Sequence, residues 1–329
     1  MKILFALPGH LKTVPMGAYS VDALRSLGHD VEPFDFHPTW RDRLAGRLRG
    51  RDEESSIMNA RLRRLAADFA PDLFVTLFGF ELSERTIAFL RARGVPTACW
   101  WINDPFQLER SLTKAPWYDF VFSNSSGVLP EYRARGVMHA AFLPTACEPR
   151  VHRPVAPRAE WRCEVCFAGD WSPLREKVME GLARRFDVRV FGPWKRKLAP
   201  GSRLHERLHD GFFSPDDMAA MFASAEVVLN LHTWYGRFEH GVNPRLFEAA
   251  ACGACQLVDW KREIPALFDC QRELRCYQAI EELDTAVAEA LGAHALRKAA
   301  GAAARARALG EHTYVHRMQA LLSIVASSP

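Results

Sequence analysis

Three common phosphate-binding and metal-binding patterns are absent from this chain of 329 residues. No Gly-x-Gly-x-x-Gly follows an apolar run and no Gly-x-x-x-x-Gly-Lys-Ser/Thr occurs, which disfavours nicotinamide dehydrogenases and P-loop nucleotide hydrolases. Asp-x-Asp, a carboxylate pair often used to hold a metal ion against a nucleotide, is also missing. We therefore expect any bound phosphate to be neutralised by Arg, Lys and helix dipoles, without a metal ion or another cofactor.

Long apolar runs and strong net charge are absent as well. No apolar stretch approaches the length that spans a bilayer, and the first ten residues, MKILFALPGH, are too short for a secretory signal. The net charge of +4 is too small to indicate a nucleic-acid partner by itself. With 48% apolar and 25% charged residues, the composition is that of a globular protein large enough for two domains. We expect a cytoplasmic protein.

Cysteine is present, but eight residues in a chain of this length do not indicate a disulfide framework. Two Cys-x-x-Cys pairs, Cys163/Cys166 and Cys252/Cys255, leave a structural zinc site as an alternative. The first pair lies in a predicted strand, where residues three apart point to opposite faces. The second pair spans the end of a predicted helix and the start of a strand. Buried free thiols are therefore the favoured interpretation.

Apolar runs of strand length alternate with helical patterns along most of the chain. The predicted strands are residues 2–7, 31–36, 72–77, 96–100, 120–123, 140–143, 165–168, 188–191, 227–231 and 255–258. A Pro- and Arg-rich stretch at 144–160 interrupts the alternation and is typical of an interdomain linker. The pattern predicts an α/β fold with two doubly wound parallel sheets. We expect domains at 1–150 and 151–310, followed by a helix at 311–329.

Polar and aromatic residues follow several of these strands. Ligands of doubly wound sheets bind beyond the carboxyl ends of the strands, so these positions predict a ligand-lined cleft between the two domains. The segments concerned are Gly9-His10, Trp101–Asp104, Gly169–Trp171, Gly192–Trp194 and His232–Trp234.

The most informative segment is HGVNPRLFEAAACGACQLVDW, which starts at His240. Asn243 and the proline after it suit the N-cap and the first turn of a helix. The positive end of the helix dipole and Arg245 would attract a diphosphate, and Glu248 lies one turn further on, where it can accept hydrogen bonds from ribose hydroxyls. The pattern indicates a nucleoside diphosphate ligand. The alternative is that Asn243 only caps and that Arg245 and Glu248 form a surface pair.

Several segments resemble the CgeB-like (spore-maturation protein) glycosyltransferases, which are GT-B enzymes related to the family 4 glycosyltransferases. The most specific are FAGDWSPLREKV, GFFSPDDMAAMFASAEVVLNLH, GVNPRLFEAAACGACQLVD and EHTYVHRMQALL; PDLFVTLFG, GVPTACWWINDP and YDFVFSN fit less specifically. The resemblance implies two Rossmann-like domains that face each other across a cleft. The N-terminal domain would take the acceptor, the C-terminal domain would bind the donor, and the last helix would pack back on the N-terminal domain.

The resemblance also implies roles for single residues. Those implied for the donor diphosphate are Gly241, Asn243, Arg245 and Arg175. Those implied for the ribose and the base are Glu248, Gly169 and Trp194. For Arg175 the alternative is a solvated residue in the first turn of a helix.

One position departs from many family 4 relatives, which carry a second Glu eight residues before the ribose Glu. Here that position is His240, with Glu239 beside it. The departure leaves open whether the reaction retains or inverts the sugar configuration, and an inverting reaction needs a base on the acceptor side. Asp104 is one candidate, although it suits a cap of the turn before Pro105 equally well. The residues predicted for catalysis are Asp104, His10 and His240, and those predicted for the sugar side are His232 and Glu239.

The basic run RDRLAGRLRGR at Arg41–Arg51 is the last feature of note. It predicts either an amphipathic helix at the inner membrane face or a solvated helix that covers the first sheet. Together the patterns predict a metal-independent glycosyltransferase with a nucleotide-sugar donor and a glycan, lipid-linked or protein acceptor. The alternatives are a nucleotide-sugar epimerase and a binding or scaffold protein, the latter because of His240.

Overall fold

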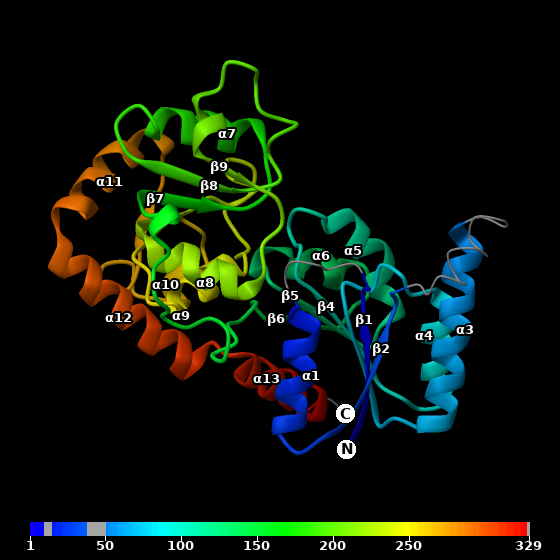
Figure 1. The fold of residues 1–329 in the computed structure, drawn as a ribbon. Coiled ribbons are helices and arrows are strands. Elements are labelled where there is room, and N and C mark those ends of the chain that lie inside the picture. Colours follow the sequence, from blue (N-terminus) through cyan, green and yellow to red (C-terminus); the bar gives the residue numbers. More distant parts are fainter. Residues whose placement is uncertain (10–14, 38–50, 328–329) are drawn as a thin grey trace. The chain divides into compact units, whose positions relative to one another are not determined.

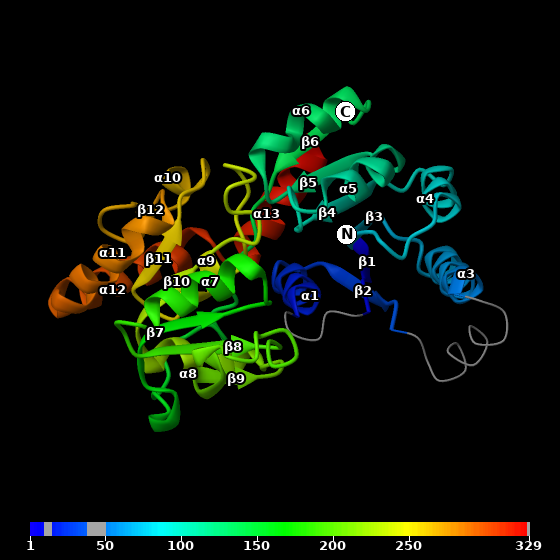
Figure 2. The same cartoon turned by 90° about the horizontal axis from the view of Figure 1, so that it is seen from above.

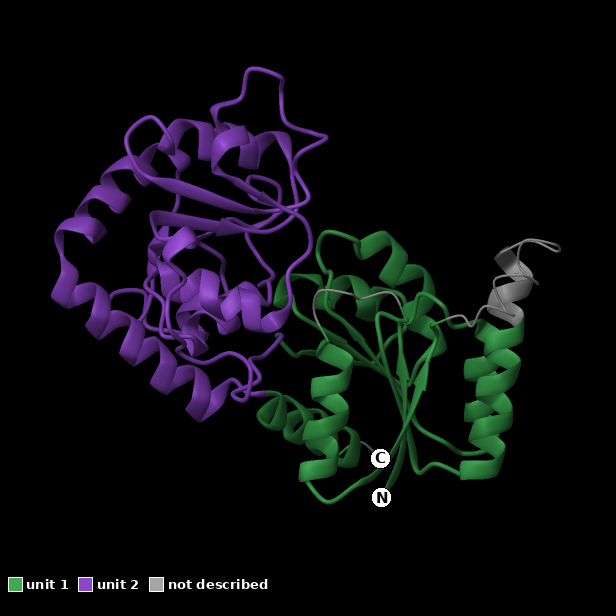
Figure 3. Ribbon diagram, viewed as in Figure 1, with its two compact units in different colours: residues 1–144, 314–329 green, residues 145–313 purple. Residues whose placement is uncertain are grey.

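The structure, a computed structural model, describes residues 1–9, 15–37 and 51–327 (Figure 1). His10 and most of the basic run, residues 41–50, lie outside the described residues, so the predictions made for them stay predictions. The chain forms two compact units (Figure 3). Unit 1 comprises Met1–Pro144 and Tyr314–Pro329, and unit 2 comprises Thr145–Thr313.

Unit 1 is built on a six-stranded parallel sheet in the order β2-β1-β3-β4-β5-β6. Its strands are β1 (Lys2–Leu7), β2 (Asp30–Asp35), β3 (Leu73–Leu77), β4 (Thr97–Trp101), β5 (Phe120–Ser123) and β6 (His139–Phe142). Its helices are α1 (Met16–Ser26), α3 (Arg51–Phe69), α4 (Glu84–Arg91), α5 (Leu108–Lys114), α6 (Leu129–Ala134) and α13 (Tyr314–Ser327). Every residue of β3, β4 and β5 is buried, as expected for parallel strands covered on both faces.

The C-terminal helix α13 packs beside α1 on one side of this sheet, while α3 and α4 lie on the other side (Figure 2). The ring of Tyr314 lies 5.4 Å from that of Tyr19 on α1 and 6.5 Å from that of Trp100 on β4, measured between centroids. Arg317 Nε donates a hydrogen bond of 2.8 Å to the carbonyl oxygen of Pro144. Aromatic packing and this bond therefore hold the end of the chain in unit 1.

Unit 2 repeats the architecture with a parallel sheet in the order β12-β11-β10-β7-β8-β9. Its strands are β7 (Cys163–Ala168), β8 (Val188–Gly192), β9 (Leu208–Asp210), β10 (Ala225–Asn230), β11 (Gln256–Asp259) and β12 (Arg275–Tyr277). Its helices are α7 (Pro173–Leu182), α8 (Pro215–Ser224), α9 (Arg245–Ala251), α10 (Ile264–Leu267), α11 (Leu283–Gly292) and α12 (His294–Glu311). The predicted α/β class with two doubly wound parallel sheets is confirmed.

Two apolar layers fill unit 2, one on each face of its sheet. One layer packs α7 and α11 against the sheet, for example through Leu182 and Val287. The other packs α8 and α9, for example through Phe222 and Ala249. The three alanines that end α9 are all fully buried, because small side chains let this helix approach the strands closely. The sheet thereby fixes the start of α9 at the carboxyl ends of the strands.

Candidate functional site

The loop before α9 has the conformation that its sequence predicts. Gly241 has φ +87°, in the left-handed region that favours glycine, and its N–H donates to Glu263 Oε2 at 2.9 Å. Asn243 Oδ1 accepts a hydrogen bond of 3.3 Å from Leu246 N–H, so this asparagine caps the first turn. Pro244 already has helical angles, φ −58° and ψ −32°. The sequence thus predicted the start of this helix correctly.

Arg245 and Glu248 form an ion pair of 3.1 Å between Nη1 and Oε2. Glu248 is buried, with a side-chain exposure of 2%, and Arg245 is partly buried at 17%, so the alternative of a surface pair is wrong. The guanidinium also lies 5.0 Å from the ring of Phe222. Within the described residues, the buried Nε of Arg245 makes no hydrogen bond. This guanidinium therefore keeps a donor for a further acceptor.

Arg175 lies in the first turn of α7, which Ser172 caps through a 3.2 Å hydrogen bond from Arg175 N–H to its Oγ. The guanidinium is buried and donates to carbonyl oxygens: Nη2 and Nε to Leu231 at 2.6 and 3.2 Å, and Nη1 to Asp170 at 2.9 Å. The alternative of a solvated side chain is therefore wrong. No carboxylate of the described residues forms an ion pair with Arg175.

Two positive charges consequently share this end of the sheet. Burial is the main cause that lowers the pKa of Arg175 to about 10; Asp170 and Asp259 raise it, and the nearby charge of Arg245 lowers it further. With its pKa at about 10, the Arg175 guanidinium still carries its charge at neutral pH. An anion placed at these strand ends would relieve the repulsion between the two charges.

The end of β10 and the turn after it connect the surrounding elements. We call Asn230, the last residue of β10, and the next two residues, Leu231 and His232, the strand-end hub. The amides of Asn230 and Asn243 pair reciprocally at 2.7 and 3.1 Å. The His232 ring accepts Asn243 N–H at Nε2 (3.1 Å), while its Nδ1 lies 2.7 Å from Asp259 Oδ1. His232 has no exposed surface, so its predicted place beside the sugar is wrong. The hub holds α7, α9 and β11 together.

The ends of β7 and β8 pack closely together through Gly169, Gly192 and Trp194. A Cβ on Gly192 would lie 2.2 Å from the Gly169 carbonyl oxygen, so this close approach requires glycine. Trp194 Nε1 donates to the same oxygen at 2.8 Å, and its side chain is 0% exposed in the apolar layer. The prediction that Trp194 flanks a base is therefore wrong. It supports the turn that carries Gly169.

Glu239 and His240 lie in the same loop as Gly241. Glu239 is exposed, and it borders a pocket of about 720 Å³ together with Arg237 and Lys261. The ring of His240 packs 5.7 Å from that of Phe238. The structure therefore brings both residues near the start of α9, and their predicted roles stay predictions.

Asp104 of unit 1 lies in a hydroxyl network. Its oxygens accept hydrogen bonds from Ser111 Oγ (2.9 Å), Ser123 Oγ (2.7 Å) and Tyr132 Oη (2.5 Å). Burial raises the pKa of Asp104, and the three hydroxyls oppose this. The side chain is 1% exposed, so neither of its predicted roles, as base or as cap of the turn before Pro105, matches the geometry. It holds the ends of β4 and β5 to α5 and α6.

All eight cysteines are free thiols. Cys163 and Cys166 lie in β7, while Cys252 ends α9 and Cys255 precedes β11. Burial raises the pKa of Cys163 and of Cys252 to about 12. Within residues 1–9, 15–37 and 51–327, no group of three or more His, Cys, Asp or Glu residues could hold a metal ion.

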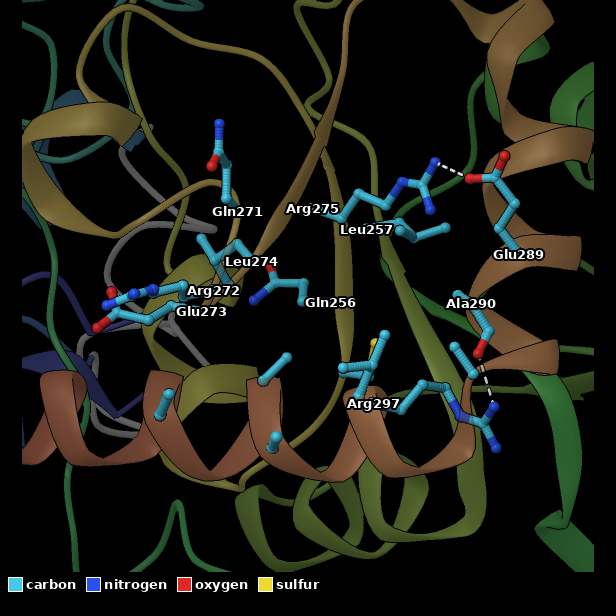
Figure 4. Close-up of a pocket in the computed structure, with 16 residues that line it drawn as sticks. Gln256, Leu257, Gln271, Arg272, Glu273, Leu274, Arg275, Glu289, Ala290 and Arg297 are labelled. Atoms are coloured by element: carbon cyan, nitrogen blue, oxygen red, sulfur yellow. Dashed lines mark hydrogen bonds and ion pairs between the residues drawn. The ribbon is translucent and has the colours of Figure 1, made fainter.

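A further pocket of unit 2, of about 440 Å³, was not predicted from the sequence (Figure 4). It is lined by the first residues of β11 and β12, Gln256 and Arg275, and by alanines of α12. Arg275 is paired with Glu289, and Arg297 donates to the carbonyl oxygen of Ala290. This pocket lies at the amino ends of the parallel strands, opposite the hub. Two arginines of this pocket, Arg275 and Arg297, are each paired with a glutamate, Glu289 and Glu226 respectively.

Comparisons with known proteins agree with this architecture. Residues 174–323 match the model of the family described as glycosyl transferase-like. Spore protein CgeB of Bacillus subtilis is 24% identical over 204 residues, which cover 58% of this chain and 64% of CgeB. The chain therefore spans less than two thirds of that relative. No helix in the described ranges is long and apolar enough to cross a membrane.

Two solved structures are similar over the whole chain. Sucrose-phosphate synthase from Thermosynechococcus elongatus has a TM-score of 0.71 at 13% identity, with 100% of both chains covered. HepE of Anabaena, in complex with UDP-glucose, has a TM-score of 0.65 at 14% identity, again with 100% of both chains covered. At these identities the likeness concerns the fold. The sequence matches show a similarity of residues 174–323 to the glycosyl transferase-like family and of the chain to CgeB.

Proposed function

We propose that unit 2 binds a nucleoside diphosphate sugar at the hub end of its sheet and that the protein transfers the sugar to an acceptor hydroxyl. The observation that carries this proposal is the buried guanidinium of Arg175 together with the partly buried guanidinium of Arg245, at the carboxyl ends of the strands. Arg175 has no ion-pair partner in the described chain, and Arg245 has an unused Nε donor. A diphosphate supplies the acceptors and the negative charge that this arrangement lacks.

The remaining contacts follow from the start of α9. Glu248 lies one turn from the helix start, where its carboxylate can exchange part of its pairing with Arg245 for hydrogen bonds to two ribose hydroxyls. Gly241 and the Asn243 cap keep the main chain close to the diphosphate. That the similar structure of HepE holds UDP-glucose supports a donor of this chemical class.

The proposed reaction breaks the bond between the anomeric carbon and the diphosphate oxygen and forms a bond from that carbon to the acceptor oxygen. The acceptor proton passes to a base, and the electron pair of the broken bond stays on the diphosphate. Arg175 and Arg245 would stabilise the charge that develops there, which fits transfer without a metal ion. We propose a glycan, a lipid-linked sugar or a protein as the acceptor.

A binding screen against UDP, GDP, dTDP and their common sugars, with and without EDTA, tests the donor site. We expect one nucleotide to raise the melting temperature and to bind in calorimetry, with the same affinity in EDTA, because a ligand selective for the native state stabilises it. Glu248→Gln and Arg245→Gln should each weaken this binding by about tenfold or more, as expected for lost charge-assisted contacts.

The matched control is Arg185→Gln, which removes an exposed arginine whose partner is Asp284. It should bind the nucleotide like the wild type. Absence of binding by every nucleotide diphosphate in folded protein would overturn the donor site, and binding that EDTA abolishes would overturn metal independence. Donor binding without transfer to any acceptor would favour a scaffold.

A further inference from the structure

The loop that leads into α9 is held through a chain of buried polar groups. Asp259 ends β11, and its Oδ1 accepts two hydrogen bonds from His232, one from the main-chain N–H (2.8 Å) and one from the ring Nδ1 (2.7 Å). Its Oδ2 lies 2.8 Å from Lys261 Nζ. On the far side of the ring, Nε2 accepts the main-chain N–H of Asn243 at 3.1 Å. The order is therefore Lys261, Asp259, His232 and Asn243.

These contacts determine the state of the His232 ring. A main-chain N–H can only donate, so Nε2 must be the unprotonated nitrogen that accepts from Asn243. The ring proton then sits on Nδ1 and is donated to Asp259 Oδ1. The side chains of Lys261, Asp259 and His232 are all buried. Lys261 Nζ also donates to the carbonyl oxygen of Phe238 at 3.1 Å. The imidazole is thereby fixed in one tautomer and one orientation.

Asn243 occupies a special position at the end of this chain of groups. Its main-chain N–H is held by His232, its side-chain amide pairs with Asn230, and its Oδ1 caps the turn that contains Arg245. A displacement of Asn243 would therefore move the start of α9, together with Arg245 and Glu248. An error of about 1 Å in a binding group is enough to lower affinity or rate severely.

We propose that His232 and Asp259 are positioning residues for the donor: through the Asn243 main-chain N–H, they hold the start of α9 in the geometry that binds the diphosphate. This inference rests on the proposed donor site and deepens it. His232 and Asp259 act through Asn243 and do not touch the donor themselves. Lys261 keeps Asp259 ionised and oriented, since the buried ammonium faces the oxygen that His232 leaves unused.

Two substitutions of His232 show whether it acts by holding the Asn243 N–H or only by filling space in the buried core. In His232→Gln, the amide oxygen can reach the place of Nε2 and accept from Asn243 N–H. In His232→Asn, the amide can replace Nδ1 toward Asp259, but it offers nothing at Nε2. We expect His232→Asn to raise the donor dissociation constant about tenfold and His232→Gln to raise it at most about threefold, although both lower the melting temperature.

Tyr277→Phe is the matched control for lost stability. Tyr277 is buried and its Oη donates to the main-chain carbonyl oxygen of Asn230 at 3.2 Å, whereas Asn243 pairs with the side-chain amide of Asn230. The variant should melt earlier and bind the donor with wild-type affinity. Equal loss of donor affinity in His232→Asn and His232→Gln, in step with their loss of stability, would overturn the proposal.

If the His232 variants do not fold, a double substitution keeps the test open. Asp259→Asn with Lys261→Met keeps an oxygen for both His232 donors and removes both buried charges. We expect donor affinity within about threefold of the wild type. A tenfold loss there would mean that charge, and not the position of Asn243, governs binding, and would overturn the proposal.

A measurement without ligand separates this proposal from the donor site itself. Amide hydrogen exchange at Asn243 should become about tenfold faster in His232→Asn and remain near the wild-type rate in His232→Gln. One outcome is that the wild-type protein binds no nucleotide while Asn243 still exchanges faster in His232→Asn than in His232→Gln. That result would overturn the proposed donor site but would support the role of His232 in holding Asn243. Unchanged exchange in His232→Asn would overturn the proposal directly.

Discussion

The two units bury carboxylates at corresponding ends of their sheets, but they neutralise them differently. In unit 1, Asp104 is surrounded by three hydroxyls. In unit 2, Asp259 faces Lys261 and His232, and Glu248 faces Arg245. Burial raises the pKa of Asp104. Burial also acts to raise the pKa of Asp259, but His232 and Lys261 outweigh it and hold this pKa at about 2.

The difference indicates what each sheet end is suited to do. Hydroxyls can accommodate either state of an acid, so the Asp104 network mainly fastens elements of unit 1 to one another. In unit 2, Lys261 and Arg245 place positive charges against the carboxylates of Asp259 and Glu248. Arg175 adds a buried charge without a carboxylate partner in the described residues. Unit 2 therefore offers the positive charge that the proposed donor site requires.

The largest expected effect comes from breaking a buried ion pair in unit 2. Arg245→Met leaves Glu248 buried without its cation, which should lower the free energy of unfolding by about 3 to 5 kcal/mol. The double variant Arg245→Met/Glu248→Gln should recover most of this loss, because no unpaired charge remains. Urea denaturation measures both, and an equal loss in the two variants would contradict the account.

Gly192→Ala should have the next largest effect. Its Cβ would lie 2.2 Å from the main-chain oxygen of Gly169, and such overpacking costs about 1 to 3 kcal/mol. Gly181→Ala is the control, since its Cβ meets nothing within 4 Å inside α7, and it should stabilise by about 0.5 to 1 kcal/mol. Thermal denaturation measures both changes. Equal melting temperatures of Gly192→Ala and the wild type would mean that Gly192 does not lie as close to Gly169 as described.

The two buried aspartates should give opposite dependences of stability on pH. The native state binds the Asp104 proton more tightly than the unfolded chain, so the free energy of unfolding falls as pH rises from the ordinary to the raised pKa. For Asp259 it falls as pH drops from about 4 to about 2, where only the unfolded chain is protonated.

Urea denaturation across this pH range, in the wild type and in Asp104→Asn, checks the Asp104 contribution. The substitution should remove the fall at rising pH and keep the fall at low pH. An unchanged profile would mean that burial does not raise the pKa of Asp104.

The smallest effect belongs to exposed pairs, which serve as the reference for the buried ones. Arg185→Gln removes a 3.2 Å pair with Asp284 in which both side chains are exposed. We expect a change of about 0.5 kcal/mol or less in the free energy of unfolding, further reduced by salt. A loss as large as that of Arg245→Met would remove the distinction between surface and buried pairs.

The sequence predicted the parts of the site that depend on local chain geometry. The cap at Asn243, the turn at Gly241 and the spacing of Arg245 and Glu248 follow from residue types along a few positions. Alternating apolar runs likewise predicted ten strands. β9 and β12 were missed, because three residues are too few to show a period.

The rest of the site depends on contacts between distant segments. Spacing places His232, Trp194 and Asp104 after strands, but it does not tell whether a side chain points to a ligand or is buried among its neighbours. One signal was available: Asn230-x-His232 and Asp259-x-Lys261 repeat a polar pair after two strands. That these strands are neighbours in the sheet became known only from the structure.

Hydrogen exchange of the protein with and without its preferred nucleoside diphosphate tests the central claim most directly. The account predicts protection of the segments 169–175 and 241–248, with little change in 271–275 and 289–303 around the pocket at the opposite end of the sheet. Protection of the latter segments alone would place the nucleotide in that pocket and contradict the account.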